Sequence, residues 1–321
     1  MRRLVAALTV LVLVGACARH DGAAVRPSGA SPGPRLVSVE DLGGRVDLLT
    51  VDSPALGRKA SVWVVRPRGW RPGSTGWPAL YLLHGCCESR ADSWLAEGGA
   101  ERLTGDLDAV VIVPEGGPMG WYSDWLRGPA WETFHMTEVR GVVERRYGVG
   151  DRRAVAGLSM GGLGALAYAA RHPGVFQAAA SFSGVLDTSY DRPGLEELMR
   201  SFGVDPADLW GTPPAGTWRE HNPVDLAARL KGVRLFVSCG DGEPGPLDGA
   251  GAALDRGERA ILVRNRRFVA AARAAGVPVT TDFYGPGTHT WPYWERELDR
   301  ALPTLAGSWR PGPSANPMPT A

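Results

Sequence analysis

Short, continuous runs of apolar residues recur along the middle of the chain, and longer amphipathic segments separate them. The runs lie at residues 79–83, 109–113, 154–156, 178–180, 233–237 and 277–284. Continuous apolar runs are typical of parallel strands that are covered on both faces. Residues 45–51 and 60–65 instead alternate in part between apolar and polar positions, which favours antiparallel strands near one edge of the sheet.

Most of the longer segments between these runs have apolar residues at helical spacing. They lie at residues 131–146, 160–171, 223–230 and 258–275. Strands that alternate with helices over this length predict an α/β fold with a mostly parallel central sheet and helices on both of its faces. We place this single domain at residues 38–307.

Charge and composition exclude several classes of function. The chain of 321 residues has 35 Lys and Arg against 34 Asp and Glu, which leaves no basic field for the backbone of a nucleic acid. Its hydrophobic share of 44% is too high for a disordered protein. No Cys-x-x-Cys pair or His/Cys cluster predicts a zinc site. We therefore expect neither a nucleic-acid partner nor a metal or other cofactor.

The N-terminus is typical of an export signal. Residues 1–17 combine a basic start with an apolar stretch from Leu4 to Val14, which has the length of a signal-peptide core and is too short to cross a bilayer. The tetrapeptide VGAC at residues 14–17 resembles the lipobox of bacterial lipoproteins, in which Cys17 would be lipidated. An ordinary secretory cleavage site is the alternative. We expect an exported protein, anchored by lipid on the outer face of the bacterial cytoplasmic membrane or else secreted.

Two segments that flank the domain have the composition of unstructured chain. Residues 18–37 are rich in Ala, Gly, Pro and Ser and predict a flexible linker. Residues 308–321 are rich in Pro and predict a disordered tail.

A nucleophile motif follows one of the apolar runs. The pentapeptide GLSMG at residues 157–161 has the form GxSxG, and it lies between the strand at 154–156 and the helix at 160–171. In that setting the serine sits on a tight strand-to-helix turn, where the helix N-terminus favours negative charge. We therefore predict that Ser159 is a catalytic nucleophile.

A serine nucleophile needs a base and an orienting acid, which this kind of fold supplies in the order Ser, acid, His. His289 lies in a Gly/Pro-rich loop after the last predicted strand, from which it can reach back over the sheet. The remaining histidines lie in the linker, after the first apolar run, or in and beside predicted helices: His20, His84, His135, His172 and His221. We predict His289 as the base.

The residues alone leave the acid open. Asp241 and Glu243 follow the strand at 233–237, which is a usual position for the acid. Asp255 and Glu258 fit a capping box and could merely cap the next helix. Glu258, however, heads the helix row that faces the sheet, and a buried carboxylate needs a partner such as a catalytic imidazole. This argument puts Glu258 only slightly ahead of Asp241.

From about Leu80 to Leu305 the chain resembles the antigen 85 mycolyltransferases and the wider esterase D-like group of α/β-hydrolases. The shared stretches are LLHG at 82–85, WYSDW at 121–125, WETF at 131–134, GLSM at 157–160, LWG at 209–211, CG at 239–240 and HTWPYW at 289–294. The resemblance implies an α/β-hydrolase fold and identifies Ser159, Glu258 and His289 as nucleophile, acid and base. It also implies that the backbone N–H groups of Cys86 and Met160 form the oxyanion hole.

The chain departs from the mycolyltransferases where those enzymes contact trehalose. Their LLDGLR pattern carries an Asp and an Arg, and here His84 and Cys87 stand at these positions. We therefore expect a secreted serine carboxylic-ester hydrolase that forms an acyl-enzyme from a small-molecule or lipid acyl ester. The alternatives are an acyltransferase of the mycolyltransferase or diacylglycerol acyltransferase type and a non-catalytic binding protein of the same fold. We expect His84, Trp125 and Trp291 to line the substrate pocket.

The remaining cysteines carry no clear signal. If Cys17 is lipidated, Cys86, Cys87 and Cys239 remain, and the sequence does not determine any disulfide among them. Because adjacent cysteines rarely bridge each other, we expect Cys86 and Cys87 to be half-buried thiols. Cys239 is expected to be a packing residue.

Overall fold

The computed structural model describes residues 33–87, 90–213, 216–307 and 309. The expected signal peptide, the lipobox with Cys17 and most of the linker and tail lie outside the described residues. Within the described ranges, no helix is long and apolar enough to cross a membrane.

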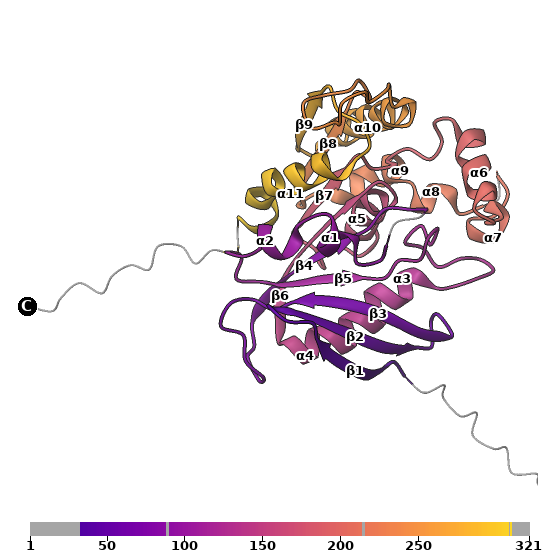
Figure 1. The fold of residues 1–321 in the computed structure, drawn as a ribbon. Helices are drawn as coiled ribbons and strands as arrows, with labels where there is room; N and C mark the ends of the chain where they lie inside the picture. Colours follow the sequence, from indigo (N-terminus) through magenta and orange to yellow (C-terminus); the bar gives the residue numbers. More distant parts are fainter. Residues whose placement is uncertain (1–32, 88–89, 214–215, 308, 310–321) are drawn as a thin grey trace, which may run out of the picture. The chain divides into compact units, whose positions relative to one another are not determined.

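A nine-stranded sheet organises the described residues, in the order β1-β2-β3-β5-β4-β6-β7-β8-β9 (Figure 1). The strands are β1 (Arg35–Asp41), β2 (Val46–Ser53), β3 (Arg58–Val65), β4 (Trp77–Leu83), β5 (Val110–Pro114), β6 (Val149–Leu158), β7 (Ala178–Phe182), β8 (Arg234–Gly240) and β9 (Val279–Gly285). All pairs from β5 to β9 are parallel, whereas β1, β2, β3 and β5 pair in antiparallel fashion. The alternating segments thus lie on the antiparallel side, as their pattern predicted.

Helices cover both faces of this sheet. One apolar cluster packs beneath α5 (Met160–Arg171), α10 (Arg256–Ala274) and the π-helix η1 (Phe134–Glu144), and the other beneath α1 (Ser93–Ala96), α2 (Ala100–Leu103) and α11 (Trp291–Ala306). Successive residues of a strand point to opposite faces, so the apolar run of β4 contributes alternately to both clusters. This double burial explains why the parallel strands are apolar throughout, and the predicted α/β architecture is confirmed.

All four predicted helical segments are present, but two of them are divided. The segment at 131–146 consists of α3 (Trp131–Thr133), η1 and α4 (Arg145–Tyr147), and the segment at 223–230 of α9 (Pro223–Leu226) and the 3-10 helix η2 (Ala227–Leu230). Strand β1, helix α11 and the shorter helices were not predicted from the sequence. These shorter helices are α1, α2, α6 (Arg192–Ser201), α7 (Pro206–Leu209) and α8 (Trp218–His221). Most of them span about one turn, which is too short for apolar periodicity to be visible.

Both predicted domain boundaries need correction. Strand β1 begins at Arg35, within the segment assigned to the linker, because its backbone pairs with β2 and Leu36 packs against the core. Trp309, assigned to the tail, is buried and belongs to the cluster beneath α11. The folded part therefore extends beyond residues 38–307 at both ends.

Candidate active site

Ser159 occupies the sharp turn between β6 and α5. Its φ of 54° lies in the left-handed region, which is unfavourable for a residue with a side chain. The shortest hydrogen bonds that hold the turn are from the Ser159 N–H to the carbonyl of Phe182, at 2.9 Å, and from the N–H of Gly162 to the Ser159 carbonyl, at 3.0 Å. The fold thus imposes the strained conformation on Ser159 and places it at the carboxyl ends of the parallel strands.

The glycines of the motif are required by close backbone approach. A Cβ on Gly157 would collide with the carbonyl of Gly161, and a Cβ on Gly161 would collide with the carbonyl of Leu83 at the end of β4. The turn after β6 is therefore packed directly against the chain that leaves β4. This contact brings Ser159 and the segment after His84 to the same place.

Glu258 lies in the first turn of α10 and is completely buried. One oxygen, Oε2, accepts a hydrogen bond of 2.7 Å from Nδ1 of His289, and the other, Oε1, accepts from the hydroxyl of Ser183 (2.7 Å) and the N–H of Gly240 (2.8 Å). Because a carboxylate only accepts hydrogen bonds, this contact places the proton of a neutral imidazole on Nδ1 and leaves Nε2 as the acceptor. A neutral imidazole in this tautomer can take a proton from a hydroxyl.

The other candidate acids do not contact this imidazole. Asp241 accepts from the N–H of Glu243, and Glu243 pairs with Arg259. Asp255 caps α10 by accepting from the N–H of Glu258 at 3.0 Å, and its second oxygen accepts from the backbone N–H of His289 at 2.9 Å. Of the four carboxylates, only Glu258 is hydrogen-bonded to the side chain of His289.

Two further residues, which the sequence analysis did not single out for this purpose, support the pair. The hydroxyl of Ser183, just after β7, accepts from the indole N–H of Trp294 at 3.2 Å while it donates to Glu258. The Trp294 ring also meets the His289 ring edge to face, with centroids 4.7 Å apart. The aromatic residues of the closing HTWPYW stretch were the available signal for Trp294, whereas Ser183 was marked only by its place at a strand end.

Ser159 and His289 come to the same edge of the sheet because β6, β7, β8 and β9 are neighbours. The side chain of His289 is 25% exposed, so one side of the ring is open. The Ser159 hydroxyl makes no hydrogen bond to the described residues. In resting enzymes the contact between nucleophile and base is often long and tightens only when substrate binds.

His84 is held by the backbone on both sides of its ring. Its Nδ1 lies 2.7 Å from the carbonyl of Gly85, and its Nε2 accepts from the N–H of Gly116 at 2.8 Å. Burial lowers the pKa of His84, which keeps the ring neutral as these two contacts require. This differs from the expected role in the substrate pocket, because the side chain is 1% exposed and both nitrogens are used.

Cys86 and Cys87 form a disulfide with each other, which corrects the expectation that they are thiols. Adjacent side chains diverge in regular backbone, but Cys87 has a left-handed φ of 79° and its N–H donates to the carbonyl of Pro118 at 2.6 Å. The expectation of free thiols rested on how rarely adjacent cysteines bridge in regular backbone, and the backbone at Cys87 is not regular. Cys239 is a buried free thiol 3.2 Å from Oε1 of Glu258.

The segment from Gly116 to Tyr122 connects the two predicted oxyanion donors. Besides the contacts of Gly116 and Pro118, the hydroxyl of Tyr122 donates to the carbonyl of His84 at 2.9 Å, and the N–H of Trp121 points to Sδ of Met160 at 3.3 Å. Trp121 and Tyr122 both have positive φ values, of 53° and 51°. Such a conformation for two consecutive aromatic residues could not be read from the sequence.

The two tryptophans expected in the pocket have structural contacts. Trp125 donates from its indole N–H to the carbonyl of Gly120 at 3.1 Å. Trp291 packs edge to face against Trp94 and Trp294, with centroids 5.3 Å apart in both cases. Trp291 therefore belongs to the packing beneath α11.

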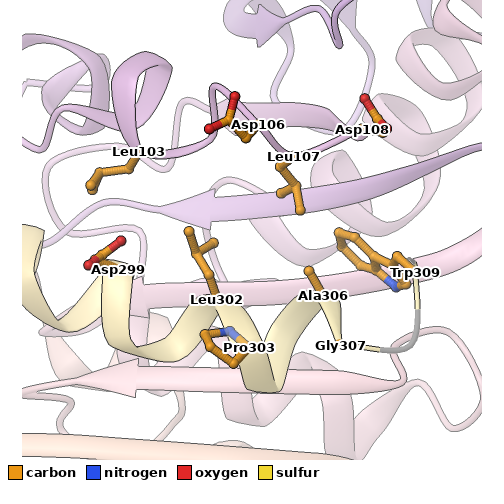
Figure 2. Close-up of a pocket in the computed structure, with 10 residues that line it drawn as sticks. All are labelled: Leu103, Asp106, Leu107, Asp108, Asp299, Leu302, Pro303, Ala306, Gly307 and Trp309. Atoms are coloured by element: carbon orange, nitrogen blue, oxygen red, sulfur yellow. The ribbon is translucent and has the colours of Figure 1, made fainter. Parts of the chain in front are cut away.

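A surface cavity of about 450 Å³ lies elsewhere in the molecule (Figure 2). It is bounded by the connection from α2 to β5, including Leu103 and Leu107, and by the end of α11, including Leu302 and Trp309. These residues lie at the end of the sheet where β5 begins, whereas Ser159 follows the end of β6. The described residues contain no group of three or more His, Cys, Asp or Glu side chains that could hold a metal.

Comparisons with known proteins identify the family and the relatives of the chain. The family model Esterase ("Putative esterase") matches residues 53–305. The chain is similar to the diacylglycerol acyltransferase/mycolyltransferase Ag85B of Mycobacterium leprae, with 31% identity over 281 residues, 81% of this chain and 83% of that relative. Among solved structures it is similar to Mycobacterium tuberculosis MPT51, with a TM-score of 0.71, 28% identity and coverage of 84% of this chain and 100% of the other. A ferulic acid esterase gives a TM-score of 0.60, 27% identity and coverage of 85% and 98%.

Proposed function

The chain belongs to the Esterase family, shares the α/β-hydrolase fold and is related to the antigen 85 mycolyltransferases, and we propose that it is an exported serine carboxylic-ester hydrolase. Ester hydrolysis or acyl transfer is the chemistry of this family. The proposal adds the residues that perform it, the acceptor and the location.

Ser159 attacks the ester carbonyl while Nε2 of His289 takes the hydroxyl proton. Glu258 orients the imidazole through Nδ1 and stabilises the imidazolium that forms. The negative charge on the tetrahedral oxygen is accepted by the backbone N–H groups of Met160 and Cys86, each worth roughly 2.7–4 kcal/mol of transition-state stabilisation. The imidazolium then protonates the leaving alcohol, and water attacks the acyl-enzyme with the same assistance.

The observation that carries this proposal is the fully buried Glu258 carboxylate 2.7 Å from Nδ1 of His289, at the sheet edge where Ser159 has a left-handed φ. A buried charge is unfavourable unless it is paired. A strained residue between two obligatory glycines is likewise retained only where the surrounding structure imposes it. A purely structural protein of this fold has no need for both features together.

Covalent labelling with a fluorophosphonate tests the nucleophile. Wild-type protein should be labelled at Ser159, and Ser159→Ala should not be labelled and should lose esterase activity. Ser201→Ala is the matched control, because Ser201 is an exposed serine at the end of α6, and it should be labelled like the wild type. Absence of labelling in folded wild-type protein would support the non-catalytic alternative.

Water is the proposed acceptor of the acyl group. The two positions that carry a charged pair in the mycolyltransferases are here His84, whose nitrogens contact the backbone, and Cys87, which is in a disulfide. A hydrogen bond to a charged group contributes about 1.5–3 kcal/mol, so its loss weakens selection of a sugar over water. An activated ester with saturating trehalose should therefore yield mainly free acid. Predominant sugar ester would support the acyltransferase alternative.

Export and lipid anchoring are the part of the proposal that rests on residues 1–17 alone. Diacylation of Cys17 would hold the enzyme at a membrane surface without a spanning helix. In a bacterial host, the wild-type protein should fractionate with membranes, and Cys17→Ala should release it. Recovery of both forms in the soluble exported fraction would favour an ordinary secretory cleavage site.

A further inference from the structure

The N–H group of Cys86 belongs to the peptide unit that joins Gly85 to Cys86. In a trans peptide the carbonyl and the N–H point in opposite directions across one rigid plane. The carbonyl of this unit faces Nδ1 of His84 at 2.7 Å, and the His84 ring is anchored in turn by the N–H of Gly116. His84 thereby fixes the side of the plane that faces away from the proposed oxyanion.

The next peptide unit, between Cys86 and Cys87, is fixed covalently. The disulfide closes a small ring that contains this peptide bond, so the backbone of Cys86 is held between His84 on one side and the ring on the other. The N–H of Cys87 donates to the carbonyl of Pro118 at 2.6 Å, and Sγ of Cys87 lies 3.9 Å from Sδ of Met119. Without the ring, the left-handed φ of 79° at Cys87 is a conformation that a residue with a side chain tends to leave.

The same segment reaches the second proposed donor. Met119 and Trp121 are two residues apart, and the N–H of Trp121 lies 3.3 Å from Sδ of Met160. Movement of the chain at Cys87 would therefore displace both the N–H of Cys86 and the segment that contacts Met160.

We infer that the Cys86–Cys87 disulfide positions the backbone N–H of Cys86 in the oxyanion hole, so that the rate of acyl transfer depends on whether this pair is oxidised. The inference rests on the proposed function, which assigns that N–H to the oxyanion. It makes the disulfide a positioning element, because its sulfur atoms act on the reaction only through the backbone. It also gives the pair a function that has no counterpart in the mycolyltransferase pattern LLDGLR, which has no cysteine at either position.

Reduction by a dithiol reverses this arrangement. The sulfur–sulfur bond breaks and accepts two electrons and two protons, while the two thiols of the reductant lose them and join in their own disulfide. The vicinal pair is half-buried and can be approached by a small reagent, whereas Cys239 is completely buried. Burial raises the pKa of the Cys239 thiol well above its usual value, so alkylation after reduction should report on Cys86 and Cys87.

The test compares the oxidised enzyme with enzyme reduced by dithiothreitol and with the double variant Cys86→Ser/Cys87→Ser. Loss of a whole oxyanion donor lowers kcat by roughly 100- to 1000-fold in serine hydrolases, and misplacement of one should lower it by about tenfold or more. KM for a short p-nitrophenyl ester should change little, because the oxyanion forms only in the transition state. The pH profile should keep its position, since the contacts of Glu258 and His289 are untouched. Reoxidation should restore the wild type, and the double variant should be slow and indifferent to dithiothreitol.

Thermal unfolding and alkylation accompany every measurement. Unchanged kcat in enzyme whose Cys86 and Cys87 are both alkylated would overturn the inference, as would a loss of activity that only follows unfolding of the reduced protein. Two free thiols at these positions in enzyme isolated under oxidising conditions would overturn it as well. If the double serine variant does not fold, Cys86→Ser/Cys87→Gly replaces it, because glycine adopts a positive φ readily. Failure of the oxidised wild type to react with a fluorophosphonate would instead contradict the proposed function itself.

Discussion

The two sides of the candidate active site are built in different ways. On the acid–base side, after β7, β8 and β9, side chains meet side chains: Glu258 binds His289 and Ser183, and Ser183 binds Trp294. On the oxyanion side, after β4, β5 and β6, the proposed working groups are the backbone N–H groups of Cys86 and Met160. They are held by a buried imidazole, a disulfide and three residues with positive φ, namely Cys87, Trp121 and Tyr122.

The two sides position their functional groups by different means. A carboxylate and an imidazole can be placed by ordinary helices and strands, because their own side chains span the remaining distance. A backbone N–H has no side chain to adjust, so the chain itself must adopt the required conformation. The oxyanion side accordingly combines three left-handed residues with a covalent bridge, whereas on the acid–base side Ser183 also has a left-handed φ, of 48°. Substitutions on the two sides should therefore have different effects on kcat and on stability.

The largest effect is expected from Glu258→Gln on the acid–base side. Glutamine presents an amide N–H₂ group to an environment that contains only donors, from His289, Ser183 and Gly240. The imidazole then loses the partner that fixes its tautomer and stabilises its charge. We expect kcat to fall by about 10³- to 10⁴-fold, as for the equivalent change in a serine protease.

Steady-state kinetics with circular dichroism checks this prediction, since the spectrum should show a retained fold. The rate of fluorophosphonate labelling should fall together with kcat. A variant that keeps more than a tenth of wild-type kcat would mean that another carboxylate orients His289.

A smaller effect, on the oxyanion side, is expected from two substitutions of His84. Asparagine can place its amide group near the position of Nδ1 and donate to the Gly85 carbonyl, whereas glutamine reaches the position of Nε2 and the N–H of Gly116. If the orientation of the Gly85 carbonyl matters, His84→Gln should lower kcat by about tenfold or more, and His84→Asn should retain more activity. Both variants should be less stable, because each leaves one buried partner unsatisfied at about 1–3 kcal/mol.

Measuring kcat of the two variants at the same temperature distinguishes an effect of His84 on the position of the Gly85–Cys86 peptide from an effect on the stability of the fold. Equal kcat values in two folded proteins would show that the ring acts only by filling space. A lower kcat in the asparagine variant would reverse the assigned importance of the two nitrogens.

The acid–base side could be predicted from the sequence to a larger extent than the oxyanion side. The strand-to-helix setting of Ser159 and the inward-facing row headed by Glu258 are patterns of side chains, and the structure has both where the sequence analysis placed them. The hydrogen bond between Glu258 and His289 is present, although the catalytic roles of these residues stay predictions. The disulfide and the environment of His84 were missed because they depend on local φ values and on backbone contacts between segments some 30 residues apart. No apolar pattern or spacing carries that information.

An effect of intermediate size is expected on the stability of the protein in acid. It involves His135, which packs behind the oxyanion side. Burial lowers the pKa of His135 to about 4, against 6.5 for the free side chain. Between these values the unfolded chain binds a proton that the folded protein does not, so the free energy of unfolding falls as the pH drops from about 6.5 to about 4. The contribution of one such histidine has a slope of up to about 1.4 kcal/mol per pH unit. His221, whose pKa burial also lowers to about 4, adds to it.

Urea unfolding at pH 7, 6, 5 and 4 measures this slope. His135→Gln should lower stability at pH 7, because Tyr168 and the Glu115 carbonyl lose their buried partner, but it should also flatten the dependence on pH. A variant that keeps the wild-type slope would show that His135 is not a source of acid sensitivity.

The smallest effects are expected at two of the acids that do not touch the imidazole, Asp255 and Asp241. Asp255 joins the start of α10 to the loop that carries His289, since one oxygen accepts from the N–H of Glu258 and the other from the N–H of His289. Asparagine keeps one acceptor and turns a donor toward the other N–H, so one of the two contacts is lost. Because a helix N-cap contributes about 0.5–2 kcal/mol, Asp255→Asn should lower both kcat, by several-fold, and the melting temperature.

Asp241→Asn is the matched control. The side chain of Asp241 accepts only from the N–H of Glu243 among the described residues, which asparagine can still do, so the kcat of this variant should stay within about twofold of the wild type. If instead Asp241→Asn were the more damaging of the two, the acid–base side would depend on the loop after β8 and not on the start of α10, and the assignment of Glu258 would have to be given up.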